Sequence, residues 1–174
     1  LEEVNTLGKI IISDNKKTTV NINSDNSVEE NNQEKKLEDQ LIQEINSMLP
    51  EEQLQFALDQ MRKKNFDKSK QTLENFVIKF PENQLSGSAY FWLGKIYLFE
   101  SNFRQAALVF GEGVQKFPKS IKASEMYYEL VKSLKEMNKI PEACKTYSLF
   151  KENYKGDKFT KDPDNIMDQT VCEN

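Results

Sequence analysis

Histidine is absent from the 174 residues of this chain. Without histidine the chain cannot form a Ser-His-Asp or Cys-His nucleophile or a histidine zinc site, and it lacks the commonest general base. The glycine-rich phosphate loops GxxxxGK[ST] and GxGxxG are absent as well. The carboxylates recur at helical spacing on solvated positions and form no convergent pair. We therefore expect no enzyme, no catalytic residue, no metal, no cofactor and no small-molecule substrate.

Aromatic residues are missing from the first 55 positions, and all 18 of them lie between Phe56 and Phe159. A segment without aromatic side chains buries little apolar area per residue, so burial cannot offset the entropy lost on ordering. Residues 1–36 are therefore predicted to be a largely disordered leader. The folded core is expected to begin after this leader.

A short amphipathic helix is predicted over residues 37–49. Its apolar residues recur at the spacings of one helix face. They are Leu37, Leu41, Ile45, Met48 and Leu49. This stripe is shorter than two heptads, so it indicates at most the remnant of a coiled coil.

The chain also lacks the long apolar runs and the clustered positive charge of two other protein classes. No run of 18 apolar residues is present, so no transmembrane segment is predicted. Residues 1–49 hold 5 Lys and 10 acidic residues, whereas residues 50–160 hold 18 Lys or Arg and 14 acidic residues. An acidic leader beside a mildly basic body is not a nucleic-acid signature. We expect protein partners and no nucleic acid.

A 37-residue repeat appears from Pro50 onward and defines three units, 50–86, 87–123 and 124–160. Residues of one chemical type fall in register in all three units. The aligned sets are Phe66, Phe103 and Ile140; Ser69, Ala106 and Ala143; Leu73, Phe110 and Tyr147; Phe80, Phe117 and Tyr154; and Ala57, Gly94 and Val131.

Each unit contains two predicted helices. Prolines and asparagines mark the breaks, because the residue before a proline avoids the helical region. The breaking residues are Asn65, Pro81, Asn102, Pro118 and Asn138. The helices are placed near 51–64, 67–80, 84–100, 103–117, 121–137 and 141–153.

The middle unit carries the pattern Tyr90-x-x-Leu93-Gly94-x-x-Tyr97, followed by Ala106-x-x-x-Phe110 and Pro118. This resembles the signature of the tetratricopeptide repeat (TPR). Small residues stand where two antiparallel helices must approach closely, and large ones fill the space beside them. The predicted fold is all-α, with three TPR-type hairpins in a right-handed superhelix.

Residues 161–174 are predicted to form a C-terminal capping helix, because the last unit of a solenoid needs its bare face covered. Ile166, Met167 and Val171 are the residues expected to cover it. Two cysteines, Cys144 and Cys172, lie in the last unit and in this cap. They are either two independent thiols, typical of a cytosolic protein, or one disulfide that ties the cap to the last unit.

Over residues 54–160 the chain resembles the YbgF/CpoB family, the periplasmic TPR proteins of the Tol-Pal system. The resemblance rests on four segments. They are Phe66-Asp67-Lys68-Ser69 with Phe80-Pro81; Ala89-Tyr90-Phe91-Trp92-Leu93-Gly94; Phe117-Pro118-Lys119-Ser120-Ile121-Lys122-Ala123; and Glu142-Ala143-Cys144.

The resemblance implies a non-enzymatic, periplasmic scaffold that coordinates outer-membrane constriction with peptidoglycan synthesis during cell division. It implies TolA and the peptidoglycan synthase machinery as partners, a homotrimer formed through the N-terminal region, and a Cys144–Cys172 disulfide in an oxidising periplasm. The chain begins at Leu1 without a recognisable signal peptide, and residues 1–49 contain no long heptad run. The alternatives are a TPR component of outer-membrane protein assembly, similar to BamD, and an unrelated TPR adaptor.

In a TPR array the first helix of each pair lines a concave groove. Repeat register assigns ten residues to it: Leu54, Leu58, Met61, Phe91, Lys95, Leu98, Phe99, Tyr128, Lys132 and Lys135. Apolar anchors beside lysines suit a partner segment that is partly hydrophobic and partly acidic. Substitution of both Phe91 and Tyr128 by alanine is then expected to weaken partner binding and leave helicity intact. Packing between repeats is the alternative role of each aromatic, and Trp92 fits either the core or the groove rim.

Overall fold

The computed structural model describes residues 28–161, Met167 and Cys172. Residues 1–27 of the predicted leader and most of the predicted cap, including Ile166 and Val171, lie outside the described residues. Every regular element within the described range is helical. The elements are α2 (Val28–Ser47), α3 (Pro50–Arg62), α4 (Phe66–Lys79), α5 (Ser86–Phe99), α6 (Phe103–Lys116), α7 (Ala123–Glu136), α8 (Ile140–Asn153) and the short 3₁₀ helix η1 (Lys158–Lys161).

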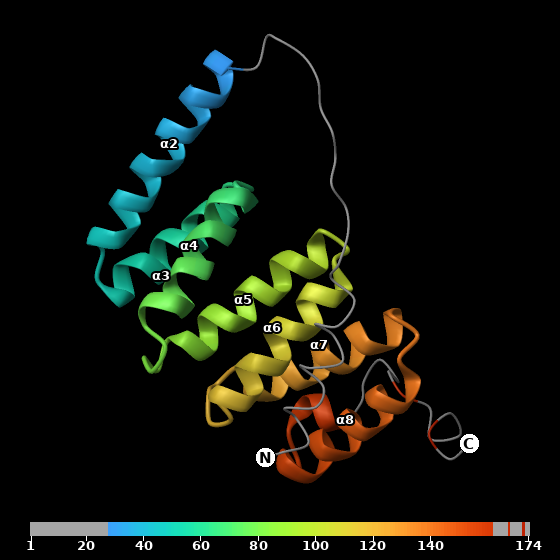
Figure 1. Ribbon diagram of the computed structural model, residues 1–174. Helices are drawn as coiled ribbons and strands as arrows, with labels where there is room; N and C mark the ends of the chain where they lie inside the picture. The colour runs from blue at the N-terminus through green and yellow to red at the C-terminus, as the bar shows by residue number, and fades with distance from the viewer. Residues whose placement is uncertain (1–27, 162–166, 168–171, 173–174) are drawn as a thin grey trace.

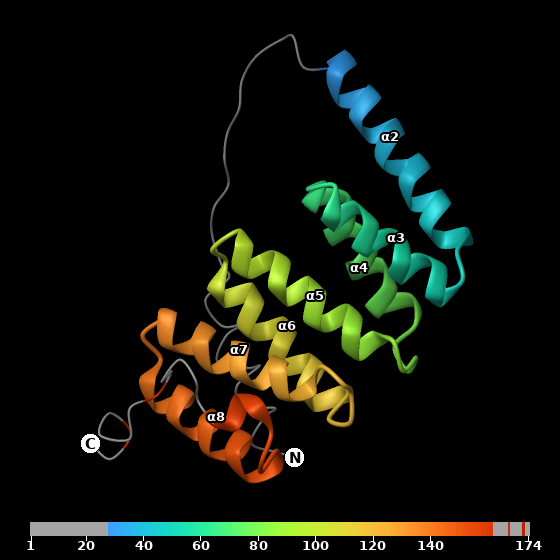
Figure 2. The ribbon, with the colours of Figure 1, turned by 180° about the vertical axis from the view of Figure 1, so that it is seen from behind.

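The six helices from α3 to α8 form three consecutive antiparallel hairpins. Figure 1 shows them following one another across the molecule, with α2 at one end and α8 at the other, and Figure 2 shows the same order from behind. Each helix packs against its neighbours in the chain, and α5 also contacts α7. Contacts that are confined to one repeat unit and the units next to it are typical of a helical repeat array. The predicted all-helical, TPR-like fold is confirmed. Each end of the six helices from α3 to α8 lies within two residues of its predicted position.

Helix α2 begins at Val28, nine residues before Leu37, where the sequence predicts the short helix to begin. The segment 28–36 is rich in Glu and Lys, which have high helix propensity, and it contains no apolar residue after Val28. The docked part lies further on, where Leu41 and Ile45 are buried and Leu37 is 66% exposed. Helix α2 packs against α4, and Asn46 accepts hydrogen bonds there from Lys79 Nζ and Asn75 Nδ2.

The turn inside each hairpin uses the same backbone conformation at the same repeat position. Lys64, Ser101 and Asn138 are the non-glycine residues with positive φ among the described residues, with φ values of 63°, 57° and 57°. They are 37 positions apart. A left-handed residue after the last helical turn is a common way to end a helix. The repeat therefore extends from side-chain type to backbone geometry.

Small residues stand where the two helices of a hairpin meet, as predicted. A Cβ built on Gly94 would lie 2.4 Å from the Phe110 ring, so α5 and α6 touch at this pair. In the first unit the Ser69 hydroxyl donates to the Ala57 carbonyl at 2.8 Å, which requires the same close approach. Gly113 plays this part between units, since a Cβ there would lie 2.7 Å from Met126 Sδ.

Two glycines should respond in opposite ways to alanine. The substitution G94A forces a methyl group into the buried Phe110 ring, and overpacking of this kind typically costs about 1–3 kcal/mol. The substitution G111A meets only Leu130, at 4.0 Å, so it should stabilise by about 0.5–1 kcal/mol through helix propensity. Urea unfolding of the two variants checks the prediction. Destabilisation by both substitutions would contradict the assigned helix contacts.

Candidate protein-binding face

Three of the ten residues assigned to a groove are buried, and for them the prediction of an exposed contact is wrong. Leu54 is 9% exposed, Phe91 1% and Tyr128 3%. They occupy one repeat position in the three first helices α3, α5 and α7. Other side chains of the array surround these three residues, so a partner cannot reach them in this arrangement.

The segment that follows the second helix of each hairpin explains this burial. Lys122 Nζ lies 4.4 Å above the Phe91 ring, and the Phe159 ring lies 5.4 Å from Tyr128. Lys122 follows Phe91 by 31 positions, and Phe159 follows Tyr128 by the same interval. Leu54 and its counterpart Leu85 belong to one apolar cluster. The connection that follows the second helix of each unit thus covers one residue of that unit's first helix, and this 31-residue spacing was the sequence signal that could have revealed it.

The seven remaining residues reach the surface, and we call them the first-helix face. Phe99 is 69% exposed and Lys135 is exposed, while the others are half-buried. The members are Leu58, Met61, Lys95, Leu98, Phe99, Lys132 and Lys135. The first two units supply its apolar side chains, and the third unit supplies lysines. Without its three buried members, the predicted surface therefore still combines apolar side chains with lysines.

Phe99 is the most exposed aromatic contact point on the first-helix face. It ends α5, and its ring centroid lies 4.4 Å from that of Phe66 at the start of α4. Its equivalents in the other units are Arg62 and Glu136. Repeat packing therefore does not require an aromatic residue here. An exposed aromatic ring that rests on a half-buried one is a typical anchor for a protein partner.

The lysines of this face differ in their surroundings. Lys95 Nζ lies 2.7 Å from Glu129 Oε1, and this ion pair joins α5 to α7. Lys132 Nζ lies 5.5 Å above the Tyr128 ring. Lys95 is thus tied to the neighbouring unit, and its charge is offset by a carboxylate. The net positive charge of the face is concentrated on the third unit.

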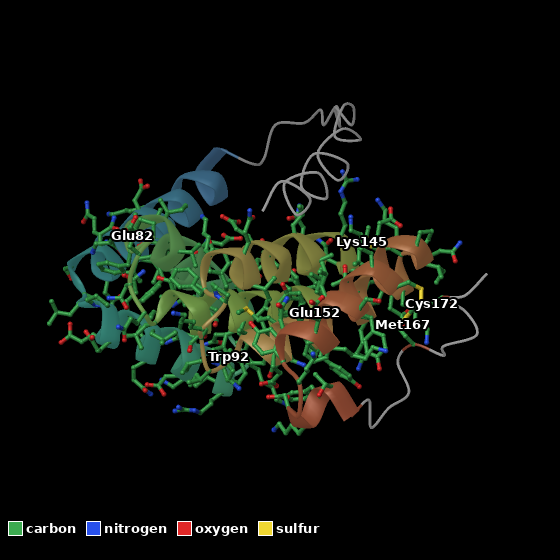
Figure 3. The ribbon with its side chains drawn as sticks, turned by 90° about the horizontal axis from the view of Figure 1, so that it is seen from below. Glu82, Trp92, Lys145, Glu152, Met167 and Cys172 are labelled. Atoms are coloured by element: carbon green, nitrogen blue, oxygen red, sulfur yellow. A yellow bond between two sulfur atoms is a disulfide. The ribbon has the colours of Figure 1, made fainter. Side chains whose placement is uncertain are left out.

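Trp92 is half-buried and packs against both apolar clusters of the array. Its ring centroid is 5.0 Å from that of Phe91, and Lys122 Nζ lies 5.6 Å above it. Figure 3 shows it away from the end of the array that carries Cys172. Trp92 therefore connects neighbouring units, and its indole is not a free anchor.

The C-terminal end of the array is covered by residues that follow α8. Met167 is 4% exposed and belongs to the larger apolar cluster. It stands 37 positions after Leu130, so it takes the place of a first-helix core residue from a fourth unit. The Cys144 and Cys172 sulfurs are bonded, with Cα atoms 5.5 Å apart. Figure 3 shows Met167 and Cys172 together beside α8.

Four tyrosines have raised pKa values because they are partly buried. Burial, followed by the hydrogen bond to Glu74, raises the pKa of Tyr97. Burial, with weaker repulsion from Tyr127 and Asp157, raises the pKa of Tyr154 to about 12. Burial is also the largest cause of the raised pKa of Tyr90 and of Tyr127. Since all four stay neutral at higher pH than free tyrosine, the packing within and between units depends on their neutral form.

Alkaline pH should therefore weaken the array. A folded-state pKa above the unfolded value near 10 means that the stabilisation is complete below pH 10. It is then lost as pH rises through the folded-state pKa, which is about 12 for Tyr154. Urea midpoints measured across this interval, with tyrosinate absorbance in parallel, check the prediction. The Y154F variant should lose less stability over the interval, and a midpoint independent of pH would contradict the expected linkage.

Within the part of the chain that the structure describes, no group of three or more His, Cys, Asp or Glu side chains is placed to hold a metal ion. None of the described helices combines the length and the apolar character needed to cross a membrane. The first-helix face, in contrast, offers apolar and charged groups to another polypeptide.

Comparisons with known proteins give a short match. Two curated sequences, both described as "Cell division coordinator CpoB", are 35% identical to this chain over 48 residues. One is from Pseudomonas putida strain KT2440 and the other from Pseudomonas putida. The match covers 28% of this chain and 18% of each relative. No family model matches the chain. The chain is thus similar to a cell division coordinator over a limited segment.

Proposed function

We propose that this chain is a non-enzymatic, periplasmic scaffold of the Tol-Pal envelope system that coordinates outer-membrane constriction with peptidoglycan synthesis during cell division. The observation that carries the proposal is the exposed apolar end of the first-helix face at Leu98 and Phe99, on a repeat array similar in part to cell division coordinators. Helical arrays commonly use such extended faces to bind other polypeptides.

The chemistry of the face favours a particular kind of partner segment. Its apolar part, around Phe66 and Phe99, would hold hydrophobic side chains, because aromatic anchors dominate the energetics of most interfaces. Its lysines on the third unit would attract acidic residues and set the direction of the bound segment. A segment of TolA with hydrophobic residues followed by acidic ones is the partner that we propose, and the peptidoglycan synthase machinery is the second.

The proposal includes association of copies through α2. Leu37 is 66% exposed and Ile42 is 39% exposed on this helix. Leu37 continues the stripe of Leu41 and Ile45 beyond the region where α2 packs on α4. Burial of Leu37 between copies would remove this apolar surface from water. A homotrimer formed in this way is the arrangement that the resemblance to the family supports.

The test is direct binding between the purified chain and the soluble periplasmic part of TolA encoded by the same genome, measured by titration calorimetry. We expect the F99D substitution to weaken binding by at least ~10-fold, as for an anchor residue. The I78D substitution is the matched control, because Ile78 is 78% exposed but lies on α4 outside the first-helix face.

Equal weakening by both substitutions would remove the first-helix face from the proposal. Absence of binding between the wild-type chain and TolA would remove the Tol-Pal assignment. Binding to an outer-membrane protein assembly factor in its place would support the BamD-like alternative.

A further inference from the structure

A pocket of about 570 Å³ lies between two loops that connect successive units. One loop joins α4 to α5 and contributes Leu85, and the other joins α6 to α7 and contributes Phe117, Pro118 and Ile121. The pocket is at the start of α5, whereas Phe99 is at its end. A helix of 14 residues separates them by about 20 Å. The pocket is therefore a surface separate from the first-helix face.

The floor of the pocket is held in place from three sides. A Cβ on Gly87 would lie 2.5 Å from the Ser120 hydroxyl, so only glycine allows the α6–α7 loop to approach α5 this closely. The Tyr154 hydroxyl donates to the Pro118 carbonyl at 2.6 Å and fixes the loop to the end of α8. The Phe117 ring packs against Tyr90 with centroids 5.9 Å apart. A site of this kind needs little reorganisation to bind, which lowers the entropic cost of association.

Packing within the array does not explain why residue 121 is an isoleucine. It is 90% exposed and lies on the rim of the pocket. Its repeat equivalents are Gln84 and Lys158, so polar residues serve the same backbone position in the other connections. An exposed isoleucine beside an apolar floor leaves apolar surface in contact with water. A bound apolar group would remove this surface from water, which is favourable.

The charged side chains that line the pocket are both lysines. Lys116 and Lys119 both line the pocket, and none of the residues that line it is acidic. Lys116 is oriented by Glu112, with Nζ and Oε1 2.5 Å apart. Lys119 has no ion-pair or hydrogen-bond partner among the residues that the structure describes. A carboxylate placed over the rim would meet an oriented lysine and an uncompensated one.

We propose that this pocket is a docking site for a short acidic peptide segment of another protein that carries one apolar side chain. The apolar side chain lies between Leu85, Phe117 and Ile121, and flanking carboxylates pair with Lys116 and Lys119. This is charge complementarity around an apolar anchor, the arrangement that gives short peptide segments specificity. The site is independent of TolA binding at the first-helix face, so either proposal can fail without the other.

Selection of random peptides displayed on phage against the whole chain tests the site. Peptides that bind wild type and not the I121N variant are retained, synthesised and measured by fluorescence anisotropy. We expect them to combine an apolar residue with two or more carboxylates. Their affinity should fall at least ~10-fold with K119E, a substitution not used in the selection, and should weaken as salt is raised.

Two variants serve as matched controls. I78N removes an apolar side chain that is 78% exposed, and K68E reverses an exposed lysine; both residues are on α4 and neither lines the pocket. Both should bind the selected peptides as wild type does. Helicity of all four variants, compared by circular dichroism, separates lost binding from lost structure.

Three results would overturn the proposal. They are the absence of enriched peptides, enrichment without acidic residues, and peptides that bind K119E as tightly as wild type. Vesicles of anionic phosphatidylglycerol are measured in parallel. Binding to vesicles that depends on Ile121, in the absence of peptide binding, would identify a membrane surface as the occupant and exclude the peptide.

Discussion

Replacement of Phe91 by alanine is expected to lower the free energy of unfolding by about 3–5 kcal/mol, the usual cost of truncating a buried phenylalanine. Phe91 is 1% exposed and packs against Trp92, Phe110 and Lys122 in the middle of the array. A domain of this size is typically stable by about 5–15 kcal/mol, so this single substitution should remove a large part of the free energy of unfolding. Since Tyr128 is buried as well, the double substitution of Phe91 and Tyr128 is expected to lower helicity, contrary to the prediction from the sequence.

The matched control for this prediction is F99A, on the same helix. Phe99 is 69% exposed, so its truncation leaves no buried cavity and should change the free energy of unfolding by about 1 kcal/mol or less. Urea unfolding followed by circular dichroism measures both variants. An F91A protein with the stability of F99A would show that position 91 faces solvent, and the covering role of Lys122 would then be wrong.

Loss of the Cys144–Cys172 bond is expected to cost about 3–4 kcal/mol by the chain-entropy model, because the bond closes a segment with a sequence separation of 28. The bond ties the C-terminal segment to α8. That segment brings Met167 into the core, and Phe159, just before it, covers Tyr128. The third unit should therefore lose the most stability, and hydrogen exchange of α7 amides should accelerate.

Urea unfolding of the oxidised chain, the reduced chain and the double variant C144S/C172S measures this effect. The chain has two cysteines, so a reductant acts on no other bond. The M167A variant in the oxidised state is the control that removes the covering side chain and keeps the bond. Equal stability of the oxidised and reduced chains would contradict the prediction, and an oxidised mass without the loss of two hydrogens would show that the bond does not form.

Much of the fold followed from local patterns. Gly94 and Ser69 mark close helix contacts because only small residues fit there, and this constraint acts within one hairpin of about 37 residues. The start of α2 was missed because residues 28–36 have helix propensity but no apolar stripe. Periodicity detects the helix face that packs, and it does not detect a polar extension of the same helix.

The candidate site was recovered in part. Leu58, Leu98 and Phe99 reach the surface as repeat register predicts, whereas Phe91 does not. Both kinds of residue belong to one side of the first helix, and helical spacing cannot distinguish them. The pocket beside Ile121 was not foreseen, because its walls come from two loops that are distant in sequence.

The amino-acid sequence by itself determined the helical hairpin, its threefold use and the small residues at each helix contact, since these depend on spacings within a unit. Tertiary structure alone decided which side of each hairpin is available to a partner. That depends on how the segment after each hairpin lies across its first helix: Lys122 covers Phe91, Phe159 covers Tyr128, and Phe99 has no such cover. Burial is a property of neighbouring units together, because a side chain leaves water only when another segment occupies its surface.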